Sequence, residues 1–169
     1  TSHSDVNVLV QGGGSTAGVQ AVDPGIADIG TVSRNLSPDE ASHLHPTVVA
    51  RDGLAIVVHP SNPVNNLTLS QVQGLFSGRI TNWQEVGGKG EEVHLVVREE
   101  GSGTREAFTQ MIMHAEGKKL EVASRAMVQQ SNGTVRELVR NDPNAIGYMS
   151  LGLVGHELKA VAVDGVHPT

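Results

Sequence analysis

The chain has 169 residues and a net charge of −6, a length that allows one medium domain or two small lobes. It contains no cysteine, which excludes disulfides, thiol catalysis and cysteine-bound metal, and no Lys/Arg-rich run, so nucleic acid is not an expected partner. Only four aromatic residues are present, so the core must be built mainly from Val, Leu, Ile and Ala.

The first third of the chain predicts short strands separated by small-residue turns. Residues 8–10, 27–34 and 47–50 read as strands, and the second ends in the polar pair Ser33 and Arg34. The first runs into residues 12–18, where three consecutive glycines followed by two hydroxyl residues, Ser15 among them, form a candidate anion-binding turn ahead of a short helix. Such a turn is also compatible with a plain flexible loop.

The middle of the chain predicts a change of lobe. Residues 54–58 form a continuous apolar run, as expected of an interior strand. Pro60 and Pro63 then make a stiff exit, where we place a lobe boundary. A capping box at residues 68–71 opens a short helix, against which the single Trp83 is expected to pack rather than to stack on a ligand.

The stretch from residue 93 to about residue 114 predicts a strand, a small-residue turn and a helix. A helix that opens at Ser102, Gly103 and Thr104 directs unpaired N–H groups and the positive end of its dipole at one point. Arg98, at the end of the strand, offers a planar fork of donors to an oxyanion. Taken alone, the turn could equally be a loop with a helix cap.

The last part of the chain continues the alternation. We predict a short strand near residues 127–128, a helix capped by residues 131–134, and strands at 145–149 and 158–163. The whole pattern indicates an α/β fold with a parallel or mixed sheet, whose ligands bind beyond the carboxyl ends of the strands.

Catalytic and metal chemistry find little support in the sequence. His43 and His45 have a His-x-His spacing but no predicted cluster of further ligands, so no metal and no cofactor are expected. A serine hydrolase using Ser15 or Ser102 stays an alternative, although neither serine lies in a Gly-x-Ser-x-Gly elbow. We therefore predict that the protein is not an enzyme.

Four ordered stretches resemble the phosphate-binding proteins of phosphate ABC transporters, which are solute receptors of the periplasmic-binding-protein type II class. They are residues 11–16 (QGGGST), 27–34 (ADIGTVSR), 75–83 (LFSGRITNW) and 98–104 (REEGSGT), with a weaker fifth at 145–148 (AIGY). The resemblance implies a two-lobed α/β receptor that captures inorganic phosphate between its lobes and delivers it to a membrane permease. It also implies a periplasmic or cell-surface location.

The resemblance carries site residues over motif by motif. Ser15 would donate to phosphate from the first lobe, and Arg98, Ser102, Gly103 and Thr104 from the second. Some family members have an aspartate where this chain has Ser33 and Arg34, which leaves discrimination against sulfate open. Arg34 would either contact the ligand or hold a neighbouring carboxylate. A receptor or sensor for another oxyanion remains the alternative with the same fold.

The resemblance also implies segments that this chain lacks, on both sides of the matched stretches. We therefore expect a fragment with a complete second lobe and a partial first lobe, which binds phosphate weakly. The expected division is a partial first lobe at residues 1–59, a second lobe at 60–155 and a return segment at 156–169.

Overall fold

The computed structural model describes residues 6–168, so residues 1–5 of the predicted first lobe and Thr169 of the predicted return segment lie outside it. The strands are β1 (Leu54–Val58), β2 (Asn66–Leu67), β3 (His94–Arg98), β4 (Met127–Gln129), β5 (Ala145–Ser150) and β6 (Lys159–Val163). The α-helices are α1 (Gly14–Val22), α2 (Pro38–His43), α3 (Leu69–Phe76), α4 (Gly103–Phe108) and α5 (Asn132–Asn141). Short 3₁₀ turns cover Trp83–Val86, Ala115–Gly117 and Leu151–Leu153.

All six strands form one mixed sheet in the order β2-β6-β1-β5-β3-β4. Strand β3 runs parallel to both β4 and β5, whereas β1 runs antiparallel to β5 and β6. This confirms the prediction of a parallel or mixed sheet. Because β3 and β4 run parallel and pair up to Arg98 and Gln129, their carboxyl ends lie at the same edge of the sheet.

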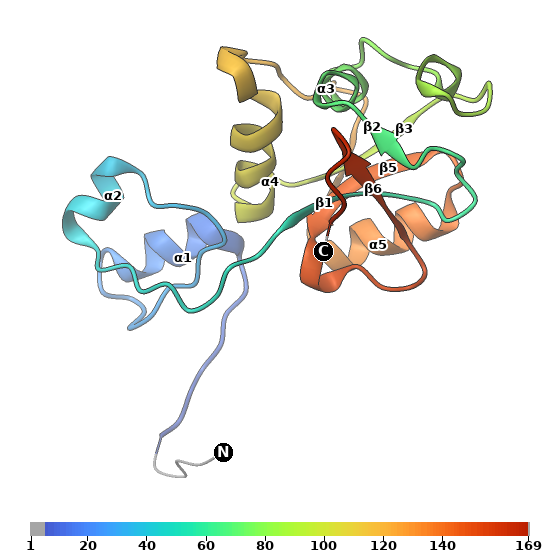
Figure 1. Ribbon diagram of the computed structural model, residues 1–169. Helices are drawn as coiled ribbons and strands as arrows, with labels where there is room; N and C mark the ends of the chain where they lie inside the picture. The colour runs from blue at the N-terminus through green and yellow to red at the C-terminus, as the bar shows by residue number, and fades with distance from the viewer. Residues whose placement is uncertain (1–5, 169) are drawn as a thin grey trace.

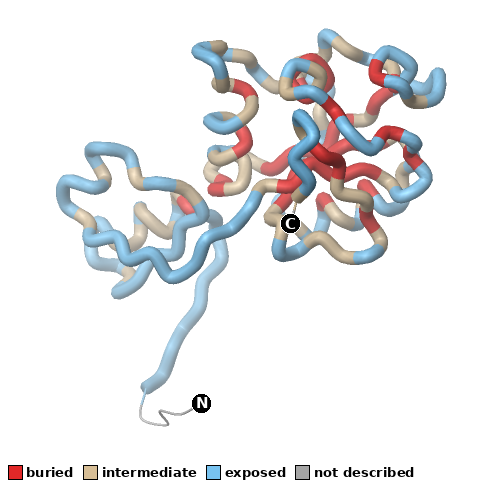
Figure 2. Tube along the Cα trace, viewed as in Figure 1, coloured by how far each residue is buried: buried red, intermediate tan, exposed pale blue. Residues whose placement is uncertain are grey.

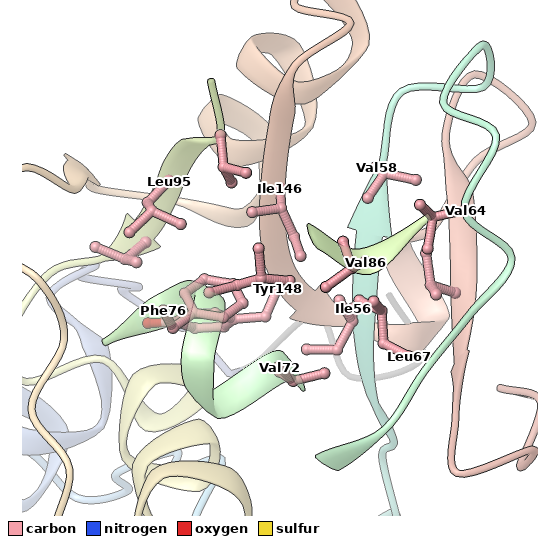
Figure 3. Close-up of a cluster of buried hydrophobic side chains, with 14 of the residues drawn as sticks. Ile56, Val58, Val64, Leu67, Val72, Phe76, Val86, Leu95, Ile146 and Tyr148 are labelled. Carbon is pink, nitrogen blue, oxygen red and sulfur yellow. The ribbon is translucent and has the colours of Figure 1, made fainter. Parts of the chain in front are cut away.

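Helices cover both faces of the sheet because its central strands alternate their apolar side chains between two buried clusters. Ile56 and Val58 of β1 join the cluster beneath α3 and α4, and Ala55 and Val57 join the cluster beneath α5. Figure 3 shows the first cluster, where Phe76 and Val72 of α3 lie against Tyr148 of β5. Two buried faces explain why β1 reads as an unbroken apolar run.

Side-chain caps fix the starts of most helices, as the sequence predicts. Full capping boxes are present at α2, where Ser37 pairs with Glu40, and at α3, where Thr68 pairs with Gln71. Helix α5 is capped by Ser131, which pairs with Thr134, and both lie in the predicted capping stretch. Each such cap satisfies one of the first backbone N–H groups of its helix.

The helix that follows β3 changes its winding halfway. After α4 the chain continues as a π-helix over Thr109–Met113, which the sequence does not predict. The buried amide of Gln73 donates to the Ile112 carbonyl at 2.8 Å and accepts from Lys118 at 2.9 Å, so α3 supports the wider turn.

The three strands predicted in the first third of the chain are wrong. Residues 8–10, 27–34 and 47–50 form no strand, and their apolar side chains are exposed, as 90% for Leu9 and 93% for Val49 show. Figure 2 shows this part almost wholly exposed beside the buried core of the larger lobe. A strand needs a neighbour for its backbone groups, and none of residues 6–168 pairs with these segments. No helix among residues 6–168 has the length and apolar character to cross a membrane.

The sheet also differs from the predicted lobe boundary. Strand β1, assigned from the sequence to the first lobe, and β6, assigned to the return segment, both pair within the sheet that contains β3 and β5. The smaller lobe seen in Figure 1 contains α1 and α2 and is joined to β1 by an extended segment. Prolines after a strand mark where it ends, but they do not indicate the lobe to which it belongs.

Candidate anion-binding site

The turn between β3 and α4 has the form predicted for an anion site. Gly101 adopts a φ of 85°, which lets the chain reverse. Ser102 is 2% exposed and caps the helix, its Oγ accepting from the Arg105 N–H at 3.3 Å. The first backbone hydrogen bond of the helix runs from the Glu106 N–H to the Ser102 carbonyl, so Gly103 and Thr104 come before it. Their two N–H groups are therefore free of intrahelical bonds.

The small-residue turn of the first lobe meets this turn directly. The Thr16 N–H donates to the Gly101 carbonyl at 3.3 Å, which is a backbone bond between the lobes. Ser15 is 4% exposed, and its Oγ accepts from the Ser33 N–H at 3.0 Å. The structure thus brings Ser15 and Ser33 to the N-terminus of α4.

The contact between these turns depends on glycines. A Cβ at Gly103 would collide with Ser15 Oγ and would lie 3.0 Å from Ser33 Cβ. Gly14 has a φ of 80°, and a Cβ there would lie 2.9 Å from the Gly101 carbonyl oxygen. Only residues without a side chain allow the two backbones to approach this closely.

Arg98 is anchored rather than free. Its Nε and Nη2 donate to the two carboxylate oxygens of Glu99 at 2.8 and 2.9 Å, and Nη1 donates to Asn132 at 3.1 Å. These bonds use three of the five N–H donors of a guanidinium. Burial raises the pKa of Glu99, but the hydrogen bonds and charge of Arg98 outweigh it, and the net pKa is lowered. Neither partner of Arg98 was predicted, because neither residue type is diagnostic.

A cavity of about 160 Å³ lies between the lobes beside this turn. Its lining residues are Thr16, Arg34, Glu100, Gly101, Ser102, Arg105, Glu106 and Thr109. Of the seven predicted ligand residues, two line the cavity, namely Arg34 and Ser102. The other five do not line it; they are Ser15, Ser33, Arg98, Gly103 and Thr104. Sequence reasoning missed the charged residues Glu100, Arg105 and Glu106, although the last two lie in the first turn of the predicted helix.

Arg34 holds a carboxylate, which was one of the two roles considered for it. Its Nη1 and Nη2 donate to the two oxygens of Glu40 at 2.7 and 2.8 Å, while the Ser37 N–H donates to Oε2 at 2.8 Å. The hydrogen bond from Arg34, followed by that from Ser37, lowers the pKa of Glu40 to about 2. Arg34 therefore lines the cavity with its positive charge, while its guanidinium is held by Glu40 of the α2 capping box.

The serines show no arrangement suited to nucleophilic catalysis. In the described part of the chain, the hydroxyl oxygens of Ser15 and Ser102 accept from backbone N–H groups, and neither hydroxyl donates to a side-chain base. Of the two histidines with His-x-His spacing, His43 contacts Asp23 at 2.9 Å. Among residues 6–168, no three His, Asp or Glu side chains gather as metal ligands.

Comparisons with known proteins agree on one family. The family model described as PBP superfamily domain matches residues 1–167. The phosphate-binding protein PstS of Bacillus subtilis is 31% identical over 168 residues, which cover 97% of this chain and 54% of that protein. The chain thus spans about half the length of this curated relative.

Two solved structures have the same fold. A putative phosphate ABC transporter substrate-binding protein from Clostridium perfringens, solved with bound phosphate, is 39% identical with a TM-score of 0.86; the match covers 92% of this chain and 63% of that one. An ABC-type phosphate transport receptor from Vibrio cholerae is 41% identical with a TM-score of 0.80, over 99% of this chain and 69% of that one.

Proposed function

The chain belongs to the PBP superfamily, and from this membership we propose that it acts as an extracytoplasmic receptor for inorganic phosphate in an ABC importer. The predicted resemblance to phosphate-binding proteins and the predicted α/β fold are confirmed by the matches. The proposal is that the ligand is phosphate, that the partner is a membrane permease and that the protein catalyses no reaction.

The observation that carries the proposal is the meeting of two small-residue turns from different lobes. Ser15 and Ser33 lie against Gly103, where helix α4 begins. Phosphate carries nearly two charges at neutral pH and is costly to take out of water unless donors replace its hydration shell. Hydroxyl and backbone N–H groups from both sides can do so without a strongly basic surface, which fits a chain of net charge −6.

We assign the ligand contacts as follows. The N–H groups of Gly103 and Thr104 and the hydroxyls of Ser15, Ser33 and Ser102 donate to phosphate oxygens. Arg98 contributes donors that Glu99 and Asn132 do not use, and Arg34 adds positive charge from the cavity. Because these groups come from both lobes, phosphate stabilises the arrangement in which the lobes touch.

The test is a titration of the 169-residue chain with inorganic phosphate, followed by amide NMR at constant ionic strength. This method detects binding even at a dissociation constant of about 1 mM, which suits the weak binding expected from the sequence. Saturable shifts are expected at the amides of residues 102–105. Absence of saturable shifts there would refute the proposal, and equal shifts with sulfate would favour a receptor for oxyanions in general.

A pair of matched variants separates ligand contact from helix capping. Ser102→Ala removes both a cap and a proposed ligand, whereas Ser131→Ala removes only the cap of α5. Each loss of a cap costs about 1 kcal/mol of stability. Only Ser102→Ala should weaken phosphate binding. Equal phosphate affinity in both variants would remove Ser102 from the site.

A further inference from the structure

Tyr148, the last residue of the AIGY motif, lies directly behind the turn between β3 and α4. It is fully buried on β5, and its hydroxyl accepts the backbone N–H of Arg98 at 3.2 Å. The pairing of β3 with β5 ends at Val96 and Gly147, two residues before Arg98. The tyrosine hydroxyl therefore takes the place of the strand carbonyl that Arg98 would otherwise need.

The ring of Tyr148 contacts the helix that follows the turn. It stacks on Phe108 of α4 with ring centroids 4.0 Å apart and an angle of 4° between the planes. Phe76 of α3 closes the group, edge-on to Phe108 at 4.7 Å (Figure 3 shows Phe76 beside Tyr148). Three of the four aromatic residues of the chain are thus gathered beneath the turn.

We propose that Tyr148 is a positioning residue for anion binding, because it fixes Arg98 and helix α4 relative to each other. This inference rests on the proposed function. Arg98 and the N–H groups of α4 lie at opposite ends of the turn 99–102, where the Ser102 N–H donates to the Glu99 carbonyl at 3.3 Å and Arg105 Nη1 donates to the Arg98 carbonyl at 2.7 Å. Tyr148 contacts the backbone of Arg98 through its hydroxyl and Phe108, the last residue of α4, through its ring, and so adds a further link between the end of the strand and the helix that carries the N–H donors.

The test compares Tyr148→Phe with Val139→Ala. The first removes only the hydroxyl and keeps the ring stack, whereas the second opens the core on the opposite face of the sheet, beneath α5. Tyr148→Phe is expected to raise the dissociation constant for inorganic phosphate about three- to tenfold, as expected for loss of one buried hydrogen bond. Val139→Ala is expected to lower the melting temperature at least as much without changing phosphate affinity.

A second measurement keeps the inference testable if the chain shows no phosphate binding, which would refute the proposed function. Amide hydrogen exchange without ligand reports the order of the turn and of α4. Faster exchange of the amides of Glu99 to Phe108 in Tyr148→Phe, but not in Val139→Ala, would support the positioning role. Unchanged exchange together with unchanged phosphate affinity in Tyr148→Phe, or equal changes in both variants, would overturn it.

Discussion

Gly103, the first residue of α4, lies against Ser15 of α1 with no room for a carbon atom between them. This contact joins the two lobes at the proposed phosphate site. It makes the absence of a side chain at residue 103 a condition for the lobes to touch.

The first prediction concerns this contact. Gly103→Ala should push Ser15 and Ser33 away from α4 and weaken phosphate binding, since overpacking of this kind costs about 1–3 kcal/mol. Gly133→Ala is the matched control, because it lies in the first turn of α5 and its Cβ would meet only Ser131 Oγ, at 3.5 Å. Amide NMR titrations of both variants measure the effect. Equal phosphate affinity for the two variants would contradict it.

A second prediction concerns Glu99, the carboxylate that holds Arg98 beside the proposed phosphate site. Glu99→Gln should tighten phosphate binding, because it removes a negative charge that competes for the guanidinium. It should also lower the melting temperature of the free protein, since Arg98 is left buried without its ionic partner. The phosphate-induced rise in melting temperature should therefore grow.

Glu92→Gln serves as the control for this second prediction. It removes the same charge, but from an exposed pair with Arg125. Such surface pairs contribute about 0–1 kcal/mol, so neither phosphate affinity nor stability should change much. Weaker phosphate binding by Glu99→Gln would mean that Glu99 serves mainly to orient Arg98.

The third prediction concerns the stability of α2 at low pH. Because the pKa of Glu40 is lowered from its usual 4.5 to about 2, its ionised form stabilises α2 in the folded chain. This stabilisation is fully present above pH 4.5 and is lost as the pH falls from there towards 2. Amide exchange across α2 at several pH values measures it. Glu40→Gln should remove the acid dependence, whereas Asp39→Asn, which leaves the bonds to Arg34 and Ser37 intact, should keep it.

The fourth prediction concerns the exposed extended segments of the smaller lobe. Leu9, Ile29 and Val49 are each more than 80% exposed on backbone without strand partners. Such segments promote association between chains. The 169-residue chain should therefore associate with rising concentration in sedimentation experiments, and Leu9→Lys with Val49→Lys should reduce this. Leu153→Lys, which adds charge at a half-exposed residue elsewhere, should not.

The helices and strands of the larger lobe could be predicted well, because caps, apolar runs and turns are local sequence patterns. The elements of this lobe also pack on one another in a buried core. The apolar run of β1, the box at Thr68 and the turn at Ser102 each became the expected element. The strands of residues 8–10 and 47–50 failed although their composition favours strands. A strand forms only where a neighbouring strand can pair with it, and the composition of a segment does not show whether such a neighbour exists.

The order of the motifs indicates which residues of the two turns meet, but not the charges that surround them; their contact with phosphate stays a prediction. Ser15, Ser33 and Gly103 meet as the ordered motifs indicate. That Glu99 and Asn132 hold Arg98 could not be predicted, because acidic and amide residues next to an arginine occur throughout surfaces and loops. The cavity-lining pair Arg105 and Glu106 depends on how the lobes face each other, and no local pattern encodes that.

The small number of aromatic residues gives the molecule two separate optical reporters. The sole indole, Trp83, is sealed in the core of the larger lobe, where its Nε1 donates to the Asn144 carbonyl at 2.9 Å. Its fluorescence will follow the melting of that core. The sole phenol, Tyr148, lies behind Arg98, so its near-ultraviolet absorption will follow events at the cleft. Unfolding and the proposed phosphate binding can therefore be followed in one sample without any attached dye.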